Sequence, residues 1–355
     1  MRRWNFGAGP GALPEAVLEE VREGLLEWGG LGLGMLELGH RTPHYEELHQ
    51  GAAARVLRLL EVDDPAGWVC LFLAGGATLQ FAQVPLNLGR QGAYAVTGTW
   101  AKKAWEEARR LGPAHLAASS EESRFDRIPA ALDVPPGASY LHLTTNNTVY
   151  GTQWAALPAC EVPLVLDASS DVLSRRLDLS RVGLLYAGAQ KNLGAAGVTV
   201  VALRRELLER TPADVPHMLS YRAHAQAGGI YNTPPVFAVW VLDLVTRWVE
   251  REGGVSAFAA KNEAKAARLY ACLDAHHLFR PHAQPAHRSR MNVTFRLARP
   301  ELEPTLLAEA EREGLLGLAG HRSVGGFRAS LYNAVPPAAV EALVAFLEAF
   351  ARRHA

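Results

Sequence analysis

The chain has 355 residues, of which 49% are hydrophobic and 20% charged, a composition that supplies a sizeable apolar core. Basic and acidic side chains both number 36, so nothing in the net charge indicates nucleic acid or an anionic membrane as the main partner. The three cysteines, Cys70, Cys160 and Cys272, form no CxxC pair, which argues against a disulfide framework or a thiolate zinc site.

The N-terminal region is predicted to be helical. Residues 1–10 contain no apolar core of signal-peptide length. A helical pattern runs from Pro14 to Trp28, and after a glycine-rich loop a second helix is predicted from Tyr45 to Leu60. The longest apolar run of the chain, Val236–Leu242, is too short to span a bilayer. We therefore expect a cytoplasmic protein.

From residue 68 onward, short apolar runs alternate with helical stretches, which predicts an α/β fold with a mostly parallel sheet covered on both faces. These runs are Trp68–Leu73, Ala93–Val96, Tyr140–Leu143, Leu164–Leu166, Leu184–Tyr186 and Val198–Leu203. A long apolar helix, Val236–Arg251, and a further helix from Val255 to His276 follow. We predict a large domain of residues 15–250 and a smaller C-terminal α/β domain of residues 251–355, with residues 1–14 packing against the smaller one.

Lys191 differs from the other four lysines. Lys102, Lys103, Lys261 and Lys265 fall on charged or polar helix faces and are interpreted as solvated side chains. Lys191 follows a buried strand and is flanked by small residues, so partial desolvation favours its neutral, nucleophilic form. Position alone favours a catalytic lysine and a lysine that reaches out to solvent equally.

Asp167 directly follows the apolar run 162–166, where a buried carboxylate requires a partner. A protonated pyridine nitrogen is one such partner, and the alternative is a helix N-cap, because Ser169 and Ser170 come next. The stretch Gly75–Gln80 reads as a strand, a small-residue turn and a helix start, an arrangement that binds phosphate. Trp100, after a similar turn, can stack on an aromatic ring or pack in the core.

Five motifs together resemble the phosphoserine aminotransferases, which are class-V pyridoxal-phosphate enzymes of fold type I. They are Asn5–Pro10, Asp167–Asp171, Gly188–Asn192, Asn232–Pro235 and His321–Ser330. The resemblance runs from residue 5 to about residue 335 in the order of the family. It implies a large domain with a seven-stranded sheet and a smaller C-terminal domain.

The resemblance also implies roles for individual residues around pyridoxal 5'-phosphate. Lys191 is similar to the lysine that holds the cofactor as a Schiff base, and Asp167 to the partner of its pyridinium nitrogen. The other implied cofactor contacts are Ala77, Thr78, Trp100, Thr148 and Gln190, with Asn232 and Thr233 reaching the cofactor of a neighbouring subunit. A homodimer with shared active sites is therefore expected, with no metal.

The implied reaction is glutamate-dependent transamination of 3-phosphohydroxypyruvate to phosphoserine in serine biosynthesis. The four-carbon 4-phosphohydroxythreonine of pyridoxine biosynthesis is a second expected substrate. Arginine suits such anions, because its planar fork binds carboxylate or phosphate through two hydrogen bonds. By resemblance Arg328 holds the α-carboxylate, and the residues around the distal phosphate are His40, Arg41, His321 and Arg322. Gly39 and Ala195–Ala196 depart from the family pattern and bear on substrate geometry.

Two alternatives remain open from the residues. One is another enzyme of the same fold. A cysteine desulfurase requires a cysteine on an active-site loop, and none of the three is evidently placed there. An aminotransferase for small, uncharged substrates would not need so many arginines near the anionic end of the substrate. A dinucleotide-binding oxidoreductase requires GxGxxG after an early strand, and the turn at Gly75–Ala77 lacks that spacing.

Overall fold

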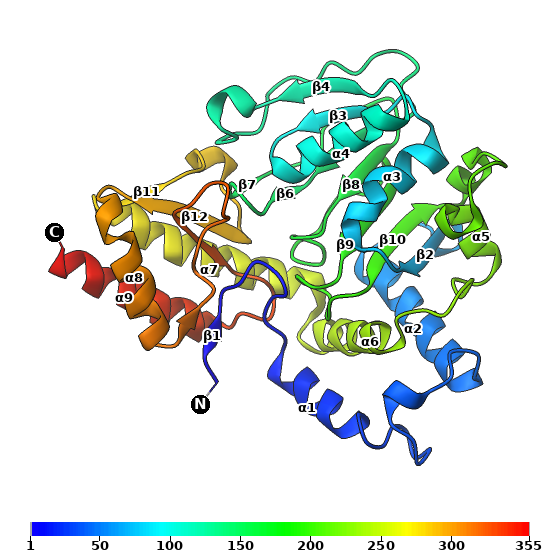
Figure 1. Cartoon of the computed structure of the whole chain (residues 1–355), viewed down its shortest axis with the longest axis horizontal. Helices are drawn as coiled ribbons and strands as arrows, with labels where there is room; N and C mark the ends of the chain where they lie inside the picture. The colour runs from blue at the N-terminus through cyan, green and yellow to red at the C-terminus, as the bar shows by residue number, and fades with distance from the viewer. Residues whose placement is uncertain (1, 355) are drawn as a thin grey trace.

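The computed structural model describes residues 2–354, so Met1 and Ala355, the outermost residues of the predicted domains, lie outside it. A seven-stranded sheet forms its centre (Figure 1). In spatial order its strands are β2 (Trp68–Leu73), β10 (Thr199–Arg204), β9 (Val182–Gly188), β8 (Leu164–Asp167), β5 (Leu141–Thr144), β3 (Ala93–Val96) and β4 (His115–Ser119). All pairs are parallel except the two that β10 makes, so the predicted mostly parallel sheet is confirmed.

The reversed direction of β10 follows from the length of the connection before it. Parallel neighbours need a crossover of a dozen or more residues, usually a helix. Only residues 189–198 join β9 to β10, and they form turns, so the two strands pair antiparallel. The apolar pattern of β10 does not reveal this direction. Lys191 lies within this short connection.

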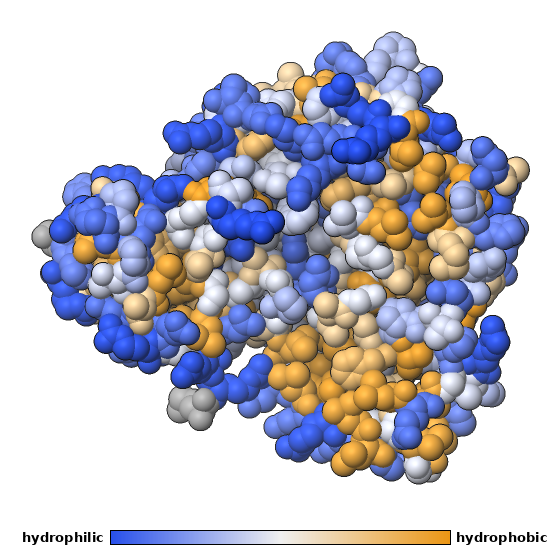
Figure 2. Space-filling view, in the orientation of Figure 1, coloured by the Kyte–Doolittle hydropathy of each residue, from blue (hydrophilic) through white to orange (hydrophobic). Residues whose placement is uncertain are grey.

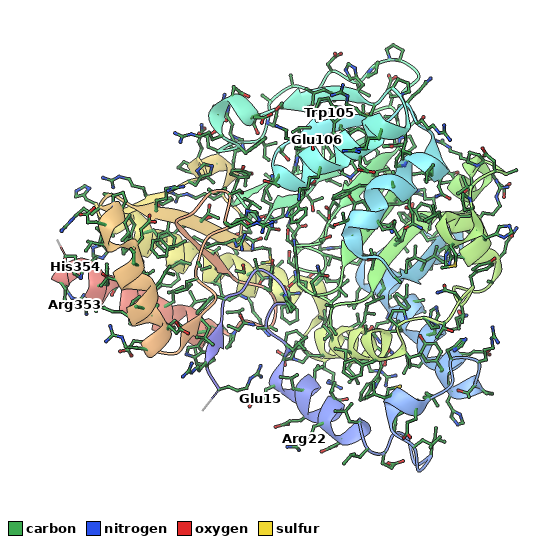
Figure 3. The ribbon with its side chains drawn as sticks, in the orientation of Figure 1. Glu15, Arg22, Trp105, Glu106, Arg353 and His354 are labelled. Carbon is green, nitrogen blue, oxygen red and sulfur yellow. The ribbon has the colours of Figure 1, made fainter. Side chains whose placement is uncertain are left out.

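The two faces of the sheet carry different helices. Alternate strand residues such as Phe72, Ala95 and Leu166 belong to one core with α1 (Glu15–Gly24), α2 (Pro43–Leu59) and α6 (Val236–Arg251). Residues between them, such as Leu71 and Tyr94, pack with α3 (Gly76–Leu88), α4 (Thr99–Leu111) and α5 (Tyr221–Gln226) on the opposite face. On α4 three alanines point inward, while Glu106 is exposed (Figure 3).

The C-terminal part has its own hydrophobic core. It contains the three-stranded antiparallel sheet β11 (Phe279–Pro281), β12 (Asn292–Leu297) and β14 (Phe327–Ser330), with α7 (Gly254–Ala275), α8 (Glu303–Arg312) and α9 (Pro337–Arg353). The N-terminal strand β1 (Trp4–Asn5) pairs with β13 (Leu315–Leu316), and Phe6 enters this core. The first turns of α7 contribute to the core of the large sheet, so this helix contacts both cores. The division at residue 250 stays a prediction.

Several element boundaries differ from the sequence prediction. The first helix ends at Gly24 and not at Trp28, because the chain turns and the Trp28 amide donates to the Leu33 carbonyl at 2.8 Å. Strand β4 is missed by the apolar pattern, since it is an edge strand whose side chains are mostly half-exposed. A small two-stranded ladder of β6 (Asn146–Asn147) and β7 (Thr152–Gln153) also lies outside the predicted elements. Among residues 2–354 no helix has the length and apolarity that crossing a membrane requires.

A buried charge cluster joins α2 to α6. Asp243 of α6 is 2% exposed and forms ion pairs with Arg55 of α2 and with Arg247, the latter at 2.8 Å. Arg55 also reaches Glu250 at 3.0 Å. Because removing one partner of a buried pair leaves the other charge uncompensated, this cluster is sensitive to loss of the carboxylate.

We expect Asp243→Ala to lower the free energy of unfolding by about 3 kcal/mol, because Arg55 loses its buried partner. Urea denaturation of the variant and the parent protein measures the difference. Arg247→Ala is the matched control, since that side chain is 50% exposed, and we expect a cost below about 1 kcal/mol. Equal effects of the two substitutions would contradict the assignment.

Candidate active site

The predicted chemical residues converge at the carboxyl ends of the parallel strands, where ligands bind in sheets of this kind. Asp167 is the last residue of β8, and Lys191 follows the end of β9. Thr148 follows β5 and the β6 strand, Trp100 lies in the first turn of α4 after β3, and Ala77 and Thr78 lie in the first turn of α3 after β2. One edge of the sheet therefore carries residues that follow five of its strands, namely β2, β3, β5, β8 and β9.

Lys191 and its loop are held by contacts with three other parts of the chain. Its Nζ donates a hydrogen bond to the Thr148 hydroxyl at 2.8 Å. Gly194 has a φ of 147° and lies against the backbone of α6, where a Cβ would come within 3.2 Å of the Leu242 nitrogen, so only glycine allows this approach. Gly9 packs against the Lys191 side chain, because a Cβ added to Gly9 would lie 3.5 Å from the Lys191 Cγ.

The charge state of Lys191 is set by burial and by two neighbours. Burial lowers the pKa of the amine to about 8, the Asp167 carboxylate opposes that shift, and Arg328 adds to it. Roughly a tenth of the Lys191 side chain is therefore the neutral, nucleophilic amine at pH 7, far more than for an ordinary lysine.

Asp167 is 5% exposed, and burial raises the pKa of its carboxyl. Hydrogen bonds from Ser169 and the charge of Lys191 act in the opposite direction. The Ser169 amide and hydroxyl both donate to Oδ1, at 3.0 and 2.6 Å. Within residues 2–354 no hydrogen bond reaches Oδ2, so this oxygen can accept a proton-bearing nitrogen of a bound group.

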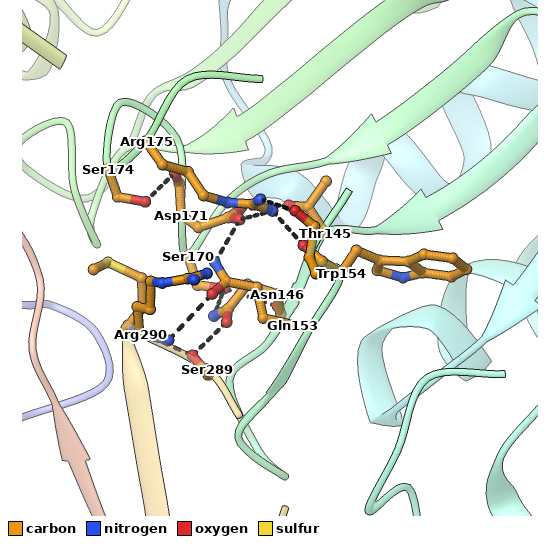
Figure 4. Close-up of polar contacts among 12 residues, drawn as sticks. Thr145, Asn146, Gln153, Trp154, Ser170, Asp171, Ser174, Arg175, Ser289 and Arg290 are labelled. Carbon is orange, nitrogen blue, oxygen red and sulfur yellow. Dashed lines mark hydrogen bonds and ion pairs between the residues drawn. The ribbon is translucent and has the colours of Figure 1, made fainter. Parts of the chain in front are cut away.

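A buried polar network fixes the segment behind Asp167 (Figure 4). The Asp171 carboxylate is fully buried and accepts hydrogen bonds from Thr145, Gln153 and Arg175, the last two at 3.0 and 3.4 Å. The amide of Thr145 donates to the Asp167 carbonyl at 3.0 Å. Because both oxygens of the buried Asp171 carboxylate are paired, the network holds the end of β8 in place behind Asp167.

A group of cationic side chains lies on the other side of Lys191. Arg328, on β14, donates from Nη1 to the Thr148 carbonyl at 3.3 Å, and its Nε is buried without a partner among residues 2–354. The His321 ring nitrogen lies 2.7 Å from the Ser323 hydroxyl. Burial lowers the pKa of His321, and the charges of Arg328, Arg322 and Lys103 lower it further. Such a cluster, with an unpaired buried N–H, fits an anionic ligand.

Lys103 is a residue whose role the sequence interpretation missed. It is exposed, as expected, but its Nζ lies 4.8 Å from the centroid of the Trp100 ring and its charge reaches His321. Its place one helical turn after Trp100 was the available signal. Ser169, interpreted from the sequence only as part of a cap, also belongs to the site. The Asp-x-Ser spacing, which favours a side-chain turn, was the signal for it.

The turn before α3 has the geometry of an anion site. Gly75 and Gly76 have φ values of 96° and 70°, and α3 begins with no side-chain cap. The first-turn amides and the exposed Thr78 hydroxyl are therefore open to a ligand. Gln190, next to Lys191, is half-buried. Its side-chain amide packs against Gly188, where an added Cβ would collide with it.

Four predicted residues are not joined to this centre. His40 and Arg41 lie between α1 and α2, and the Nε2 atom of His40 is buried and unpaired among residues 2–354. Gly39, next to them, accepts a hydrogen bond from the Thr42 hydroxyl at 2.8 Å. Asn232 and Thr233 lie between α5 and α6, and in the described part of the chain no hydrogen bond connects them to Lys191 or Asp167.

A family model described as aminotransferase class-V matches residues 3–343. A phosphoserine aminotransferase of Geobacillus kaustophilus (strain HTA426) is 51% identical over 360 residues, covering 100% of this chain and 99% of the relative. The solved phosphoserine aminotransferase from Bacillus circulans subsp. alkalophilus has a TM-score of 0.97 at 44% identity and covers 100% of this chain and 99% of its own. A solved PLP-bound phosphoserine aminotransferase from Trichomonas vaginalis has a TM-score of 0.93 at 35% identity, with coverage of 98% and 100%. These likenesses confirm the predicted fold-type I architecture.

The depressed pKa of Lys191 yields a test in cofactor-free protein. We expect reductive methylation of Lys191 to reach half its maximal rate near pH 8, because only the neutral amine reacts. Arg328→Leu is expected to raise this midpoint and Asp167→Asn to lower it, since each removes one neighbouring charge. Mass spectrometry of the labelled peptides measures the rates.

Lys102 serves as the internal control, because its hydrogen bond with Glu121 raises its pKa and delays its labelling to higher pH. A common midpoint for Lys191 and Lys102 would contradict the assignment.

Proposed function

The chain belongs to the class-V aminotransferase family, and we propose that it is a pyridoxal-phosphate-dependent phosphoserine aminotransferase, which transfers the amino group of glutamate to 3-phosphohydroxypyruvate. The observation that carries this proposal is that Lys191 lies close to both the Asp167 carboxylate and Arg328, with Lys191 and Arg328 each bonded to Thr148. An amine, a carboxylate for a ring nitrogen and cations for an anionic substrate are the parts that this transamination requires.

The residues present fit pyridoxal phosphate. The unpaired Asp167 Oδ2 suits the protonated ring nitrogen, and the open first turn of α3 with Ala77 and Thr78 suits the phosphate. Trp100 is half-buried beside the site and suits a stacked ring, and Gln190 completes the set with Thr148. When bound, the cofactor supplies an aldehyde carbon for amines and a ring that withdraws electrons from the substrate Cα.

The residues of the chain then divide the remaining work. Asp167, held by Ser169, keeps a positive charge on the ring nitrogen by remaining ionised. With the cofactor bound, the Lys191 Nζ would serve as the base that takes the proton from the substrate Cα and as the acid that gives it back, and a pKa lowered to about 8 suits both roles. The Thr148 hydroxyl orients this amine through its 2.8 Å hydrogen bond.

Substrate recognition depends on the arginines. The Nη1 atom of Arg328 donates to the Thr148 carbonyl, and its buried Nε has no partner among residues 2–354. The Nε side of the guanidinium therefore remains for the α-carboxylate. We propose that His321, which the charges of Arg322 and Arg328 reach, binds a distal phosphate or carboxylate together with Arg322, and that His40 and Arg41 complete that site. The four-carbon 4-phosphohydroxythreonine carries the same two anionic ends, so we propose it as a second substrate.

The two residue pairs that lie apart from the centre support a homodimer with shared sites. His40–Arg41 and Asn232–Thr233 both flank exposed apolar side chains. Figure 2 shows hydrophobic side chains gathered over the segment between α1 and α2. The exposed fractions there are 37% for Leu25, 86% for Leu26, 46% for Leu33 and 65% for Leu36. A contiguous apolar surface of this kind is typical of a protein interface.

We also propose a reducing, cytoplasmic compartment. Cys70 and Cys272 are buried as free thiols, and Cys160 is free and half-buried. Free cysteines persist where thiols are kept reduced.

The assay of choice measures amino transfer from phosphoserine to 2-oxoglutarate. We expect phosphoserine to be used at least ~1,000-fold better than serine, because a site built for a bound anion leaves unpaired cations with the neutral analogue. Arg322→Ala is expected to reduce this preference about tenfold, and Arg328→Ala to weaken both substrates. Lys191→Ala is expected to abolish turnover. Equal use of serine and phosphoserine, or an active Lys191→Ala protein, would overturn the proposal.

The homodimer is tested by Leu26→Asp, which places a charge in the apolar surface. We expect the dimer to dissociate at concentrations at least ~10-fold higher than for the parent, as measured by sedimentation velocity. Leu116→Asp is the matched control, because Leu116 is 38% exposed on the edge strand β4. Mixing inactive Lys191→Ala with Arg41→Ala should restore part of the activity, since mixed dimers contain one complete site. A monomeric parent protein would contradict this prediction.

A further inference from the structure

Lys265 is buried, which contradicts its interpretation as a solvated lysine. It lies on α7 and is 3% exposed. Its Nζ donates hydrogen bonds to the carbonyl oxygens of Leu331 and Tyr332 at 2.9 Å each and of Val335 at 3.0 Å. Among residues 2–354 it forms no ion pair with a carboxylate. Three main-chain carbonyls of the turn formed by residues 331–335 therefore surround one ammonium group.

This arrangement suits an ammonium group better than other side chains. A lysine carries three N–H donors in a tetrahedral arrangement, and each donor here has one carbonyl. Arginine has a planar fork that does not match three converging carbonyls, and an apolar side chain would leave buried acceptors unpaired. Burial lowers the pKa of Lys265 to about 7, with the charge of Lys261 adding to the effect. The carbonyls are the groups that stabilise the charged form.

The 331–335 turn follows β14 and is hydrogen-bonded to the loops that contain Lys191 and follow Asp167. The Asn333 amide donates to the Asn192 side chain at 2.9 Å, and Asn192 is the neighbour of Lys191. The Asn333 side chain donates to the Leu173 carbonyl at 2.9 Å, in the loop that follows Asp167. Asn262, one turn before Lys265 on α7, donates to the Asn333 side chain at 2.9 Å and to the Ser174 carbonyl at 3.0 Å.

The same turn also holds the N-terminal segment over Lys191. The Tyr332 hydroxyl donates to the Ala8 carbonyl at 2.8 Å. An added Cβ on Gly11 would come within 2.8 Å of the Tyr332 ring and 3.0 Å of the Lys191 carbonyl, so these groups are in close contact. Arg328 lies on β14, three residues before the turn begins. A shift of the turn would therefore change the distance between Arg328 and Lys191.

We propose that Lys265 is a positioning residue for the transamination: its ammonium group fixes the 331–335 turn and thereby sets Arg328 relative to Lys191. The inference rests on the proposed function, because Arg328 is taken to bind the α-carboxylate. A substrate whose carboxylate is held in the wrong place presents its Cα poorly to the Lys191 amine. An error of about 1 Å in such a placement can reduce a rate about 100-fold.

Lys265→Met tests the proposal, because methionine has similar length and no donors. We expect kcat for phosphoserine to fall by up to about 100-fold, KM to rise about tenfold, and the amides of residues 190–194 and 331–335 to exchange hydrogen faster. Lys261→Met is the matched control on the same helix, since Lys261 pairs with Glu252 at the surface and is 42% exposed. It should leave KM and exchange unchanged. An unchanged KM with a lower fraction of folded enzyme would assign Lys265 a structural role only and overturn the proposal.

Should Lys265→Met fail to fold, Lys265→Ala in the presence of propylammonium provides a second test. Propylammonium replaces the missing side-chain carbons and the ammonium group. We expect it to lower the raised KM of Lys265→Ala at least ~5-fold, whereas 1-propanol should leave KM unchanged. Absence of rescue in folded Lys265→Ala would count against the proposal. Hydrogen exchange is independent of turnover. If the parent protein lacks transaminase activity, the proposed function fails, while exchange still reports whether Lys265 fixes the turn.

Discussion

The short connection between β9 and β10 is the constraint on which the site depends. Residues 189–198 cannot accommodate a covering helix, so β10 returns antiparallel and the connection remains at the carboxyl edge of the sheet. Lys191 is therefore held beside the end of β8, where Asp167 lies. Gly194 is also required, because the connection packs directly against the backbone of α6 at this position. A longer connection with a helix would remove the lysine from the carboxylate.

Charge balance is the second feature of the site. Asp167, Lys191 and Arg328 influence one another, and each is buried or half-buried. Among residues 2–354 the buried Arg328 Nε has no hydrogen-bond partner, which is costly in a protein without a ligand, and no hydrogen bond reaches the Asp167 Oδ2. The fold retains them at the strand ends because a bound cofactor and an anionic substrate would pair with both. Function thus accounts for polar groups that stability alone would not favour.

Much of the site was predictable because strand ends are visible in a sequence. The apolar runs before Asp167 and Lys191 located both residues, and the alternation of strands with helices predicted the mostly parallel sheet. The direction of β10 was not predictable from its own residues, since apolar strands look alike in either direction. Lys265 was misinterpreted because its acceptors lie 66 to 70 residues further along the chain. Contacts of that kind leave no local pattern, and neither does the role of Tyr332, whose partner is Ala8.

The pairing of β1 with β13 has a consequence for how the chain is made. Trp4 lies opposite Leu315, and Phe6 is fully buried in the C-terminal core. These first residues leave the ribosome early, yet their partners are synthesised near the end. Contacts so distant in sequence form slowly, because a long loop must close first. Strand β1 therefore stays unpaired until residues 315–316 have been synthesised, and the core that contains Phe6 is completed late.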